Sequence, residues 1–194
     1  MSESNITKNA LAASLKKLMI KKPFDKISVS DICEGCGMNR KSFYYHFKDK
    51  YDLVNWIFSN DFLSKMNIKS YTTGWDAIRD VCNRFYEDRQ FYLNAFSIDG
   101  QNSFYDYVLE SIRPLVAGYV RTIYGDEDVQ DFFVTFFCDA FLSSIMRWLS
   151  EGMQMDSEEF VDKMIQASVG LAKVIIRDDV LMKRHKEEKV FKKS

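Results

Sequence analysis

The sequence predicts an all-α protein, and three observations support this fold class. Only 2 prolines and 8 glycines interrupt 194 residues, so few positions force the chain to turn. Apolar residues recur at helical spacing along most of the chain, and no stretch shows the alternation of a half-buried strand. Hydrophobic residues make up 46% of the sequence, which is enough for a sizeable core at this length.

Charge divides the chain into three parts. Residues 1–55 carry ten Lys and Arg against six Asp and Glu, residues 56–182 carry eleven against twenty, and residues 183–194 carry six against two. The net charge of −1 argues against indiscriminate binding to nucleic acid, while the division fits a small basic module on an acidic body. Ordinary scatter of charge is an equal alternative. We expect boundaries at 1–50 and 51–182, followed by a basic tail.

Caps and stops define the first elements. The first helix is predicted over residues 7–22, with Thr7 as its N-cap and Pro23 as its stop. Ser28-x-x-Asp31 resembles a capping box and therefore starts a second, short helix.

A turn and two further helices follow. Gly37 stands where a left-handed residue ends a helix. Asn39 caps a third helix from Arg40 to Phe47, and Asp49 starts a fourth. The spacing is that of a helix-turn-helix, two short helices joined by a tight turn.

The rest of the chain is predicted to form longer helices. Pro114 predicts a kink or break in one of them, and Asp156-x-x-Glu159 is a good start for the last. The expected helical stretches are Trp75–Phe96, Asn102–Tyr124, Val129–Gly152 and Ser157–Asp179.

Residues 132–149 are apolar on nearly every face. Such a helix must be covered on several sides, and a second subunit can supply part of the cover in a four-helix bundle across a two-fold axis. The alternative is a larger monomeric core. The candidate dimer-interface residues are Phe136, Ile145, Trp148, Phe160, Met164 and Leu171.

Aromatic residues are frequent in the body and could enclose an apolar pocket between helices. The alternative, favoured for most of them individually, is a plain aromatic core. Gln101, Asn102 and Ser103 most simply cap the helix that follows them. The candidate pocket residues are Phe85, Tyr92, Phe96, Phe104, Tyr107, Phe137 and Phe141.

The segment 28–53 carries the pattern expected of DNA recognition. The N-terminal residues of a recognition helix lie deepest in the major groove, where Arg or Lys can donate to guanine. Basic and aromatic residues after the third helix start suit phosphate contacts. Singly, each could instead be packing or solvated surface. The candidate base contacts are Arg40, Lys41, Ser42 and Tyr44, and the candidate phosphate contacts are Ser30, Asn39, Tyr45, His46 and Lys50.

Cys33-x-x-Cys36 has the spacing of a redox or zinc pair. A thioredoxin-like motif needs a neighbouring strand, and a zinc site needs more ligands. Cysteine is also a small hydrophobic residue suited to the crossing of two helices, so core packing is the favoured interpretation and a redox sensor the main alternative. No nucleophile–base pair or phosphate loop indicates an enzyme, and we expect neither a metal nor a cofactor.

The N-terminal segment resembles the TetR family of transcription regulators. The resemblance runs from Leu11 to Phe58, and the run Phe43–Leu53 is highly characteristic of the family. Two departures are the cysteines at positions where alanine is usual and Gly35, which weakens the second helix. The resemblance implies a three-helix DNA-binding domain, a helical ligand and dimerisation domain, and a homodimer that binds a palindromic DNA operator.

Two stretches of the body are similar to one branch of that family, the dihydroxyacetone-kinase regulators. They are residues 89–92 and 100–104. This similarity implies an activator that works through a protein co-regulator, whereas most of the family are repressors released by a small ligand. A scaffold that binds only protein through the Phe-rich helix is a further alternative.

We also expect a cytoplasmic protein without a membrane partner. Four cysteines are too few for a disulfide scaffold in a chain of this size. The first residues show no secretory signal, and no uninterrupted apolar run approaches the ~20 residues that span a bilayer.

Overall fold

The computed structural model describes residues 3–66, 70–98, 103–124, 131–171 and 173–174. Helices are the regular elements of these residues, which confirms the all-α prediction. The chain divides into two compact units, Met1–Gln154 and Met155–Ser194. The predicted basic tail lies outside the described residues.

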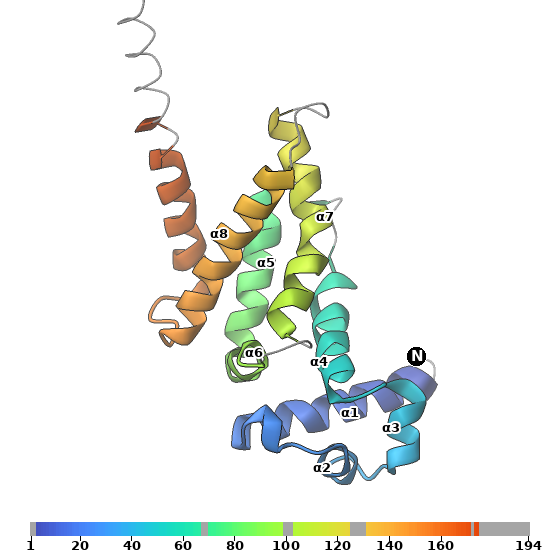
Figure 1. Cartoon of the computed structure of the whole chain (residues 1–194). Helices are drawn as coiled ribbons and strands as arrows, with labels where there is room; N and C mark the ends of the chain where they lie inside the picture. The colour runs from blue at the N-terminus through green and yellow to red at the C-terminus, as the bar shows by residue number, and fades with distance from the viewer. Residues whose placement is uncertain (1–2, 67–69, 99–102, 125–130, 172, 175–194) are drawn as a thin grey trace, which may run out of the picture. The chain divides into compact units, whose positions relative to one another are not determined.

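The N-terminal part of the first unit consists of α1 (Glu3–Lys21), the 3-10 turn η1 (Phe24–Lys26), α2 (Val29–Glu34) and α3 (Arg40–His46). Figure 1 shows α1 lying above α2 and α3. The prediction that Thr7 caps α1 is wrong, because helix precedes it. The side chains that hold these helices together are fully buried: Leu11, Leu15, Met19, Ile32 and Phe43.

A single helix leads from this part into the body. α4 (Lys50–Phe58) is capped by Asp49, as predicted, and continues into a π-helical turn, η2 (Ser59–Leu63). Figure 1 shows α4 rising from the three N-terminal helices to the side of α7. A π-helical turn widens the helix locally and is frequent at functional sites.

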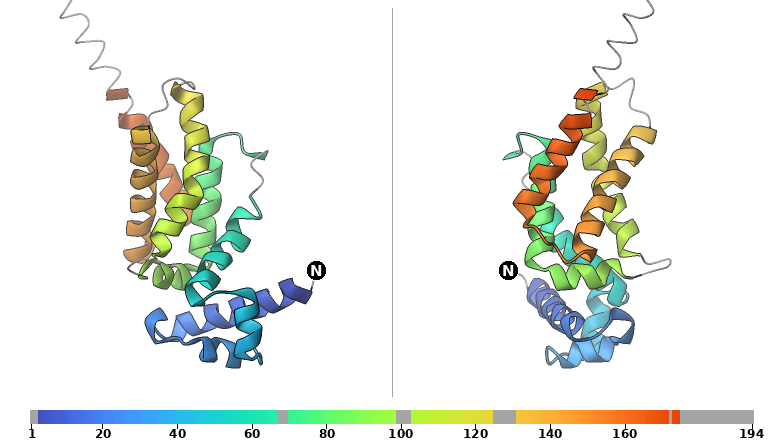
Figure 2. Two further views of the ribbon diagram at one scale, coloured as in Figure 1. Left: turned by 45° about the vertical axis from the view of Figure 1, so that its right-hand side comes forward. Right: turned by 90° about the vertical axis from the view of Figure 1, so that its left-hand side faces the viewer.

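The body of the first unit contains α5 (Gly74–Glu87), α6 (Arg89–Phe96), α7 (Phe104–Tyr124) and α8 (Asp131–Ser150). Figure 2 shows α5, α7 and α8 side by side in both views, with the short α6 at the end nearest α1.

Two predictions about these helices are wrong. The single helix expected over residues 75–96 is broken at Asp88 (φ −107°, ψ 32°), whose carboxylate accepts a hydrogen bond from Lys16 of α1. A tertiary contact therefore holds the break. The expected break at Pro114 does not occur, because α7 stays helical through it. Packing of Val120 against Val134 and Cys138 of α8 supports α7 despite the lost hydrogen bond.

α8 combines a length of 20 residues with a mean hydropathy of 1.4, which by composition alone would allow it to cross a membrane. A core helix of a folded domain passes the same test. In this structure α8 buries one face against the body, through Val134, Cys138, Leu142, Ile145, Trp148 and Leu149.

The second unit contains a helix over residues 157–171. Asp156 caps it, because its Oδ1 accepts a hydrogen bond from the Glu159 backbone at 2.9 Å. This confirms the predicted start, whereas the predicted end near residue 179 lies outside the described residues.

Candidate nucleic-acid interface and body cavity

Local hydrogen bonds set the turn that presents α3. The Ser28 hydroxyl accepts from the Asp31 backbone at 3.1 Å, and the Asp31 carboxylate accepts from the Ser28 backbone at 2.8 Å, so the predicted capping box is present. That backbone bond, followed by the Lys22 ammonium at 2.9 Å, lowers the pKa of Asp31 to about 2. Gly37 has the predicted left-handed φ of 68°.

Gly35 has a function that the sequence did not reveal. Its φ of −62° is ordinary helical backbone, but a Cβ atom here would lie 2.2 Å from the Ser14 hydroxyl oxygen. That buried hydroxyl donates to the Ile32 carbonyl at 2.7 Å. Gly35 therefore permits the close approach of α2 to α1, rather than merely weakening α2.

The N-terminal half of α3 presents basic and aromatic groups to solvent. Arg40, Lys41, Tyr44 and Tyr45 are exposed, with Tyr45 at 83%. The Arg40 guanidinium donates to the Tyr44 hydroxyl at 3.5 Å and lies 5.9 Å from the centroid of the Tyr44 ring. On the opposite side of the helix Phe43 is buried. α3 thus holds a preformed Arg–Tyr pair on its outer face.

The other predicted contacts surround this pair less openly. The Asn39 side-chain oxygen accepts from the Ser42 backbone at 2.9 Å, which confirms the predicted cap and occupies part of this side chain. Ser42, Ser30 and His46 are half-buried, and the His46 ring packs edge-on against the exposed Tyr45 ring at 4.9 Å. Their contacts with DNA stay predictions.

Lys50 requires a correction. Its ammonium donates to the backbone carbonyls of Phe24 and Ile27, each at 2.8 Å, and lies 4.4 Å from the centroid of the Phe24 ring. Burial lowers its pKa. Lys50 therefore fastens η1 to α4, and the structure does not support it as a phosphate contact. The prediction overlooked Lys48, whose side chain is exposed in the turn between α3 and α4.

Cys33 and Cys36 are packing residues in this structure. Cys33 is buried, Cys36 is half-buried, and both are free thiols. Burial raises the pKa of both, which lowers the fraction of reactive thiolate at neutral pH. The Cys36 thiol donates to the Ile32 carbonyl at 3.4 Å. Within the described residues, no three His, Cys, Asp or Glu side chains could together hold a metal ion.

Most of the predicted pocket aromatics belong to a solid core instead. Phe85, Tyr92, Phe96 and Phe104 are almost completely buried, and successive rings lie close together, for example at 4.4 Å between the centroids of Phe85 and Tyr92. Tyr107 packs against Phe58. These five predictions are wrong because α5, α6 and α7 bring the rings into mutual contact and leave no space between them.

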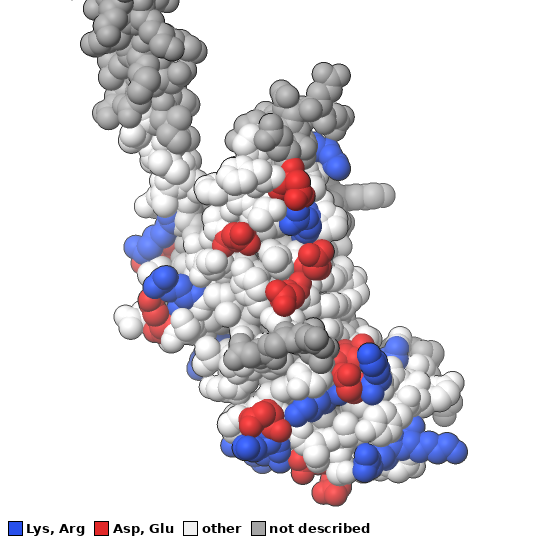
Figure 3. All heavy atoms as spheres, in the orientation of Figure 1, with Lys and Arg blue, Asp and Glu red and all other residues white. Residues whose placement is uncertain are grey.

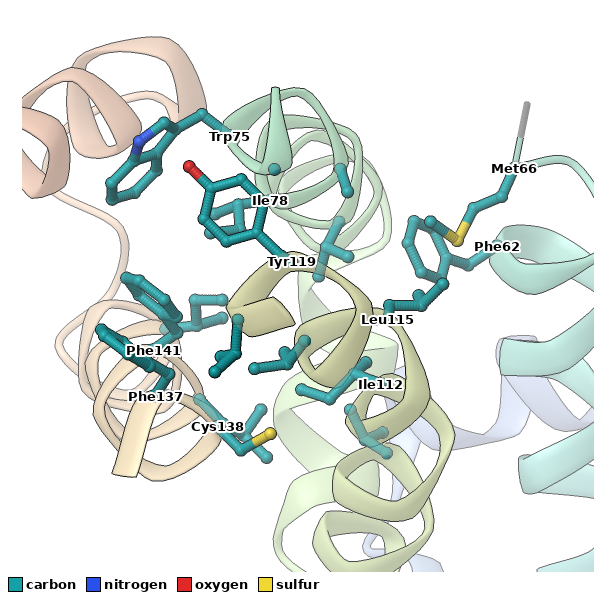
Figure 4. Close-up of a pocket in the computed structure, with 18 residues that line it drawn as sticks. Phe62, Met66, Trp75, Ile78, Ile112, Leu115, Tyr119, Phe137, Cys138 and Phe141 are labelled. Atoms are coloured by element: carbon teal, nitrogen blue, oxygen red, sulfur yellow. The ribbon is translucent and has the colours of Figure 1, made fainter. Parts of the chain in front are cut away.

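A cavity of about 270 Å³ lies elsewhere in the body, between α5, α7, α8 and the end of η2. Of the predicted residues, Phe137 and Phe141 line it. Figure 4 shows the two rings facing the space from α8, with Trp75 and Tyr119 across it. The lining residues not predicted include Phe62, Met66, Ile78, Val81, Ile112, Leu115, Val116, Tyr119 and Val120.

The chemistry of this cavity is almost entirely apolar. No Asp, Glu, Lys, Arg or His is among its lining residues, whose polar groups are the Trp75 indole, the Tyr119 hydroxyl and the Cys138 thiol. Residues 108, 112, 115, 116, 119 and 120 share one face of α7, and this aliphatic stripe was the available sequence signal. The search for aromatic residues alone missed it.

The outer face of α8 exposes large apolar groups. Phe132 and Phe136 are 68% and 55% exposed, and their rings stack with centroids 6.4 Å apart. Ile145 and Trp148 require a correction as dimer contacts, because Ile145 lines the cavity and Trp148 stacks on Tyr86.

The remaining dimer candidates lie in the second unit. Phe160 and Met164 are half-buried, and Leu171 is 61% exposed. Their contact with a partner stays a prediction.

Charge differs between the two ends of the first unit. On the face shown in Figure 3, Lys and Arg side chains gather over α1–α3 with some carboxylates among them, whereas carboxylates predominate over α7. This distribution follows the division of charge along the sequence.

Two family models match the chain. One, bacterial regulatory proteins of the tetR family, matches residues 11–57, and the other, a transcriptional regulator C-terminal region, matches residues 75–170. Among curated proteins, the HTH-type dhaKLM operon transcriptional activator DhaS of Lactococcus lactis is 36% identical over 100 residues. That alignment covers 51% of this chain and 54% of DhaS, so it spans about half the length of the relative.

Solved structures agree. The dihydroxyacetone kinase operon activator DhaS superposes with a TM-score of 0.64 at 25% identity, covering 87% of this chain and 97% of that one. A TetR regulator from Streptococcus agalactiae gives 0.61 at 20% identity, covering 85% and 94%, and NalD of Pseudomonas aeruginosa gives 0.59 at 14%, covering 84% and 97%. The chain belongs to the tetR family of bacterial regulatory proteins, which are DNA-binding transcription regulators and not enzymes.

Proposed function

We propose that this protein is a cytoplasmic regulator that binds a palindromic DNA operator as a homodimer and that an occupant of the body cavity controls this binding. The observation that carries the proposal is the Arg40–Tyr44 pair on the outer face of α3. A guanidinium already held in place loses less conformational freedom on binding a base than a free one does.

The base contacts follow from the chemistry of these groups. Arg40 can donate two hydrogen bonds to the O6 and N7 atoms of guanine, and Lys41 can donate to the same acceptors. The Tyr44 ring can contact a thymine methyl, while Ser42 is undiscriminating. We therefore expect a guanine in each operator half-site.

Phosphate contacts would orient α3 in the groove. The exposed Tyr45 and Lys48 are the best placed groups, and Ser30, Asn39 and His46 are secondary candidates because they are half-buried or engaged in the cap. Lys48 takes the part first expected of Lys50.

Dimerisation is proposed through α8 and the helix of the second unit. Exposed Phe132 and Phe136 give α8 an apolar surface, and covering it in a second copy removes it from water. Two recognition helices would then contact half-sites about 34–36 Å apart, or a multiple of that distance.

The test is selection of bound sequences from random DNA, followed by affinity measurements on the best site. Arg40→Ala should weaken binding to that site about 10- to 100-fold and relax the preference at one base pair. Glu34→Ala, an exposed change on α2, is the control. Wild-type protein that selects no palindrome would contradict the proposal, and so would an Arg40→Ala variant with unchanged specificity.

The cavity favours an uncharged apolar effector. A charged or strongly polar ligand would lose its hydration without gaining partners there. The neutral fluorophore N-phenyl-1-naphthylamine should bind with increased fluorescence, and Ala77→Phe, which adds a ring to the lining, should abolish the signal. The same substitution at exposed Ala140 should leave it unchanged, and equal signals from both variants would exclude the cavity as the site.

The target gene is proposed from the relatives. Because DhaS is named an activator of a dihydroxyacetone kinase operon, we propose an operon of that kind and activation as the sign. A triose would leave its hydroxyls unpaired in this cavity, so a protein co-regulator would have to carry a triose signal. Mapping the selected site to a different class of operon would overturn this assignment.

A further inference from the structure

One lysine joins the DNA-binding helices to the body. The Lys16 ammonium, on α1, donates to the Asp61 carboxylate of η2 at 2.5 Å and to the Asp88 carboxylate between α5 and α6 at 2.7 Å. It also lies 5.4 Å from the centroid of the Phe91 ring. The Lys16 side chain is 24% and that of Asp61 17% exposed, so water screens this ion pair less than an ordinary surface pair.

Asp61 is also next to the wall of the cavity. Phe62, the following residue in η2, is buried, lines the cavity and packs against Phe58 with ring centroids 5.5 Å apart. Both residues belong to the same π-helical turn. A displacement of the Phe62 ring by an occupant of the cavity must therefore move the backbone that carries Asp61.

A second donor stands unused beside this cluster. The Tyr92 hydroxyl, on α6, is fully buried and has no hydrogen-bond partner among the described residues. Burial, followed by the charges of Asp61 and Asp88, raises its pKa, which indicates that both carboxylates are near. An unpaired buried hydroxyl is unfavourable, so an arrangement that pairs it gains free energy that this one lacks.

We propose, resting on the function proposed above, that Lys16 is the positioning residue that transmits occupancy of the cavity to the DNA-reading helices. In the arrangement seen here Lys16 holds Asp61. When Phe62 moves, the Asp61 carboxylate leaves Lys16 and accepts the hydrogen bond of Tyr92. α1 is then released from η2, and α3 changes its position because α1 supports it through the shared core of Leu15 and Phe43.

The proposal is tested by a double-mutant cycle on operator affinity in the full-length protein at fixed salt. Lys16→Met and Phe62→Leu should each change the affinity at least fivefold. Together they should change it at least threefold less than the product of the single effects, because both act through Asp61. Lys17→Met removes the same charge from an exposed neighbour, and its effect should multiply with that of Phe62→Leu.

Two further variants distinguish coupling from a structural role. Tyr92→Phe removes the alternative donor, so it should change the operator affinity in the direction opposite to Lys16→Met while raising the melting temperature. Lys16→Arg keeps the ion pair and should restore the wild-type affinity, also if Lys16→Met does not fold.

Multiplicative effects of Lys16→Met and Phe62→Leu, or Tyr92→Phe and Lys16→Met acting in the same direction, would overturn this inference while wild-type operator binding left the proposed function intact. Wild-type protein that selects no operator would refute the proposed function itself.

Discussion

Polar groups close in sequence organise the DNA-reading helices, whereas apolar groups distant in sequence organise the body. Ser28 and Asp31, or Asn39 and Ser42, satisfy each other three residues apart. In the body, Phe85, Phe96 and Phe104 meet from three different helices. The difference teaches that the binding face is specified locally and stays rigid, while the cavity depends on how neighbouring helices pack and can respond to what fills it.

The largest expected effect separates the aromatic core from the cavity wall. Phe104→Ala removes a fully buried ring and should lower the free energy of unfolding by about 3–5 kcal/mol. Phe141→Ala, at the half-buried cavity wall, should cost roughly half as much, because atoms facing an empty space lose fewer contacts. Chemical denaturation measures both, and equal losses would show that the cavity is not a distinct feature.

The next effect tests whether one non-local contact matters within the locally specified region. Gly35→Ala places a methyl group against the Ser14 hydroxyl and should destabilise the protein by about 1–3 kcal/mol. Ser14→Ala in the same chain removes the obstructing oxygen and should recover part of the loss. If the double variant is as unstable as the sum of the two single changes, the close approach is not the cause.

Two lysines separate fold from DNA binding in the turn before α4. Lys50→Met breaks hydrogen bonds to two carbonyls and should cost about 1–2 kcal/mol of stability with little change in the salt dependence of operator binding. Lys48→Met should leave stability unchanged and reduce the slope of log affinity against log salt by about 0.9. Exchange of these two outcomes would return the phosphate contact to Lys50.

The smallest effect concerns acid. The pKa of Asp31 is lowered to about 2 in the folded chain, from 3.8, so its ionised form stabilises the fold above pH 4. That contribution falls as the pH is lowered from about 4 to 2. Asp31→Asn should flatten this part of the stability profile, and Lys22→Met, which removes one of the causes, should flatten it partly. A profile that Asp31→Asn does not alter would contradict the lowered pKa.

The predictions that succeeded depend on short-range chemistry. The caps at Ser28, Asn39 and Asp49 and the left-handed Gly37 were all predictable, because a cap needs only its own helix. The break at Asp88 was not predictable, because it depends on Lys16, 72 residues earlier.

The sequence by itself determined the helical class, the turn, and which groups α3 presents to solvent, since these follow from spacing and from neighbours within one or two helical turns. Only the tertiary structure decided that Lys50 fastens η1, that Gly35 admits Ser14, and that the cavity lies against α7 and not among the aromatic rings. The physical reason is that empty space and occupied carbonyls are properties of packed helices, and packing joins residues whose separation in the chain carries no pattern.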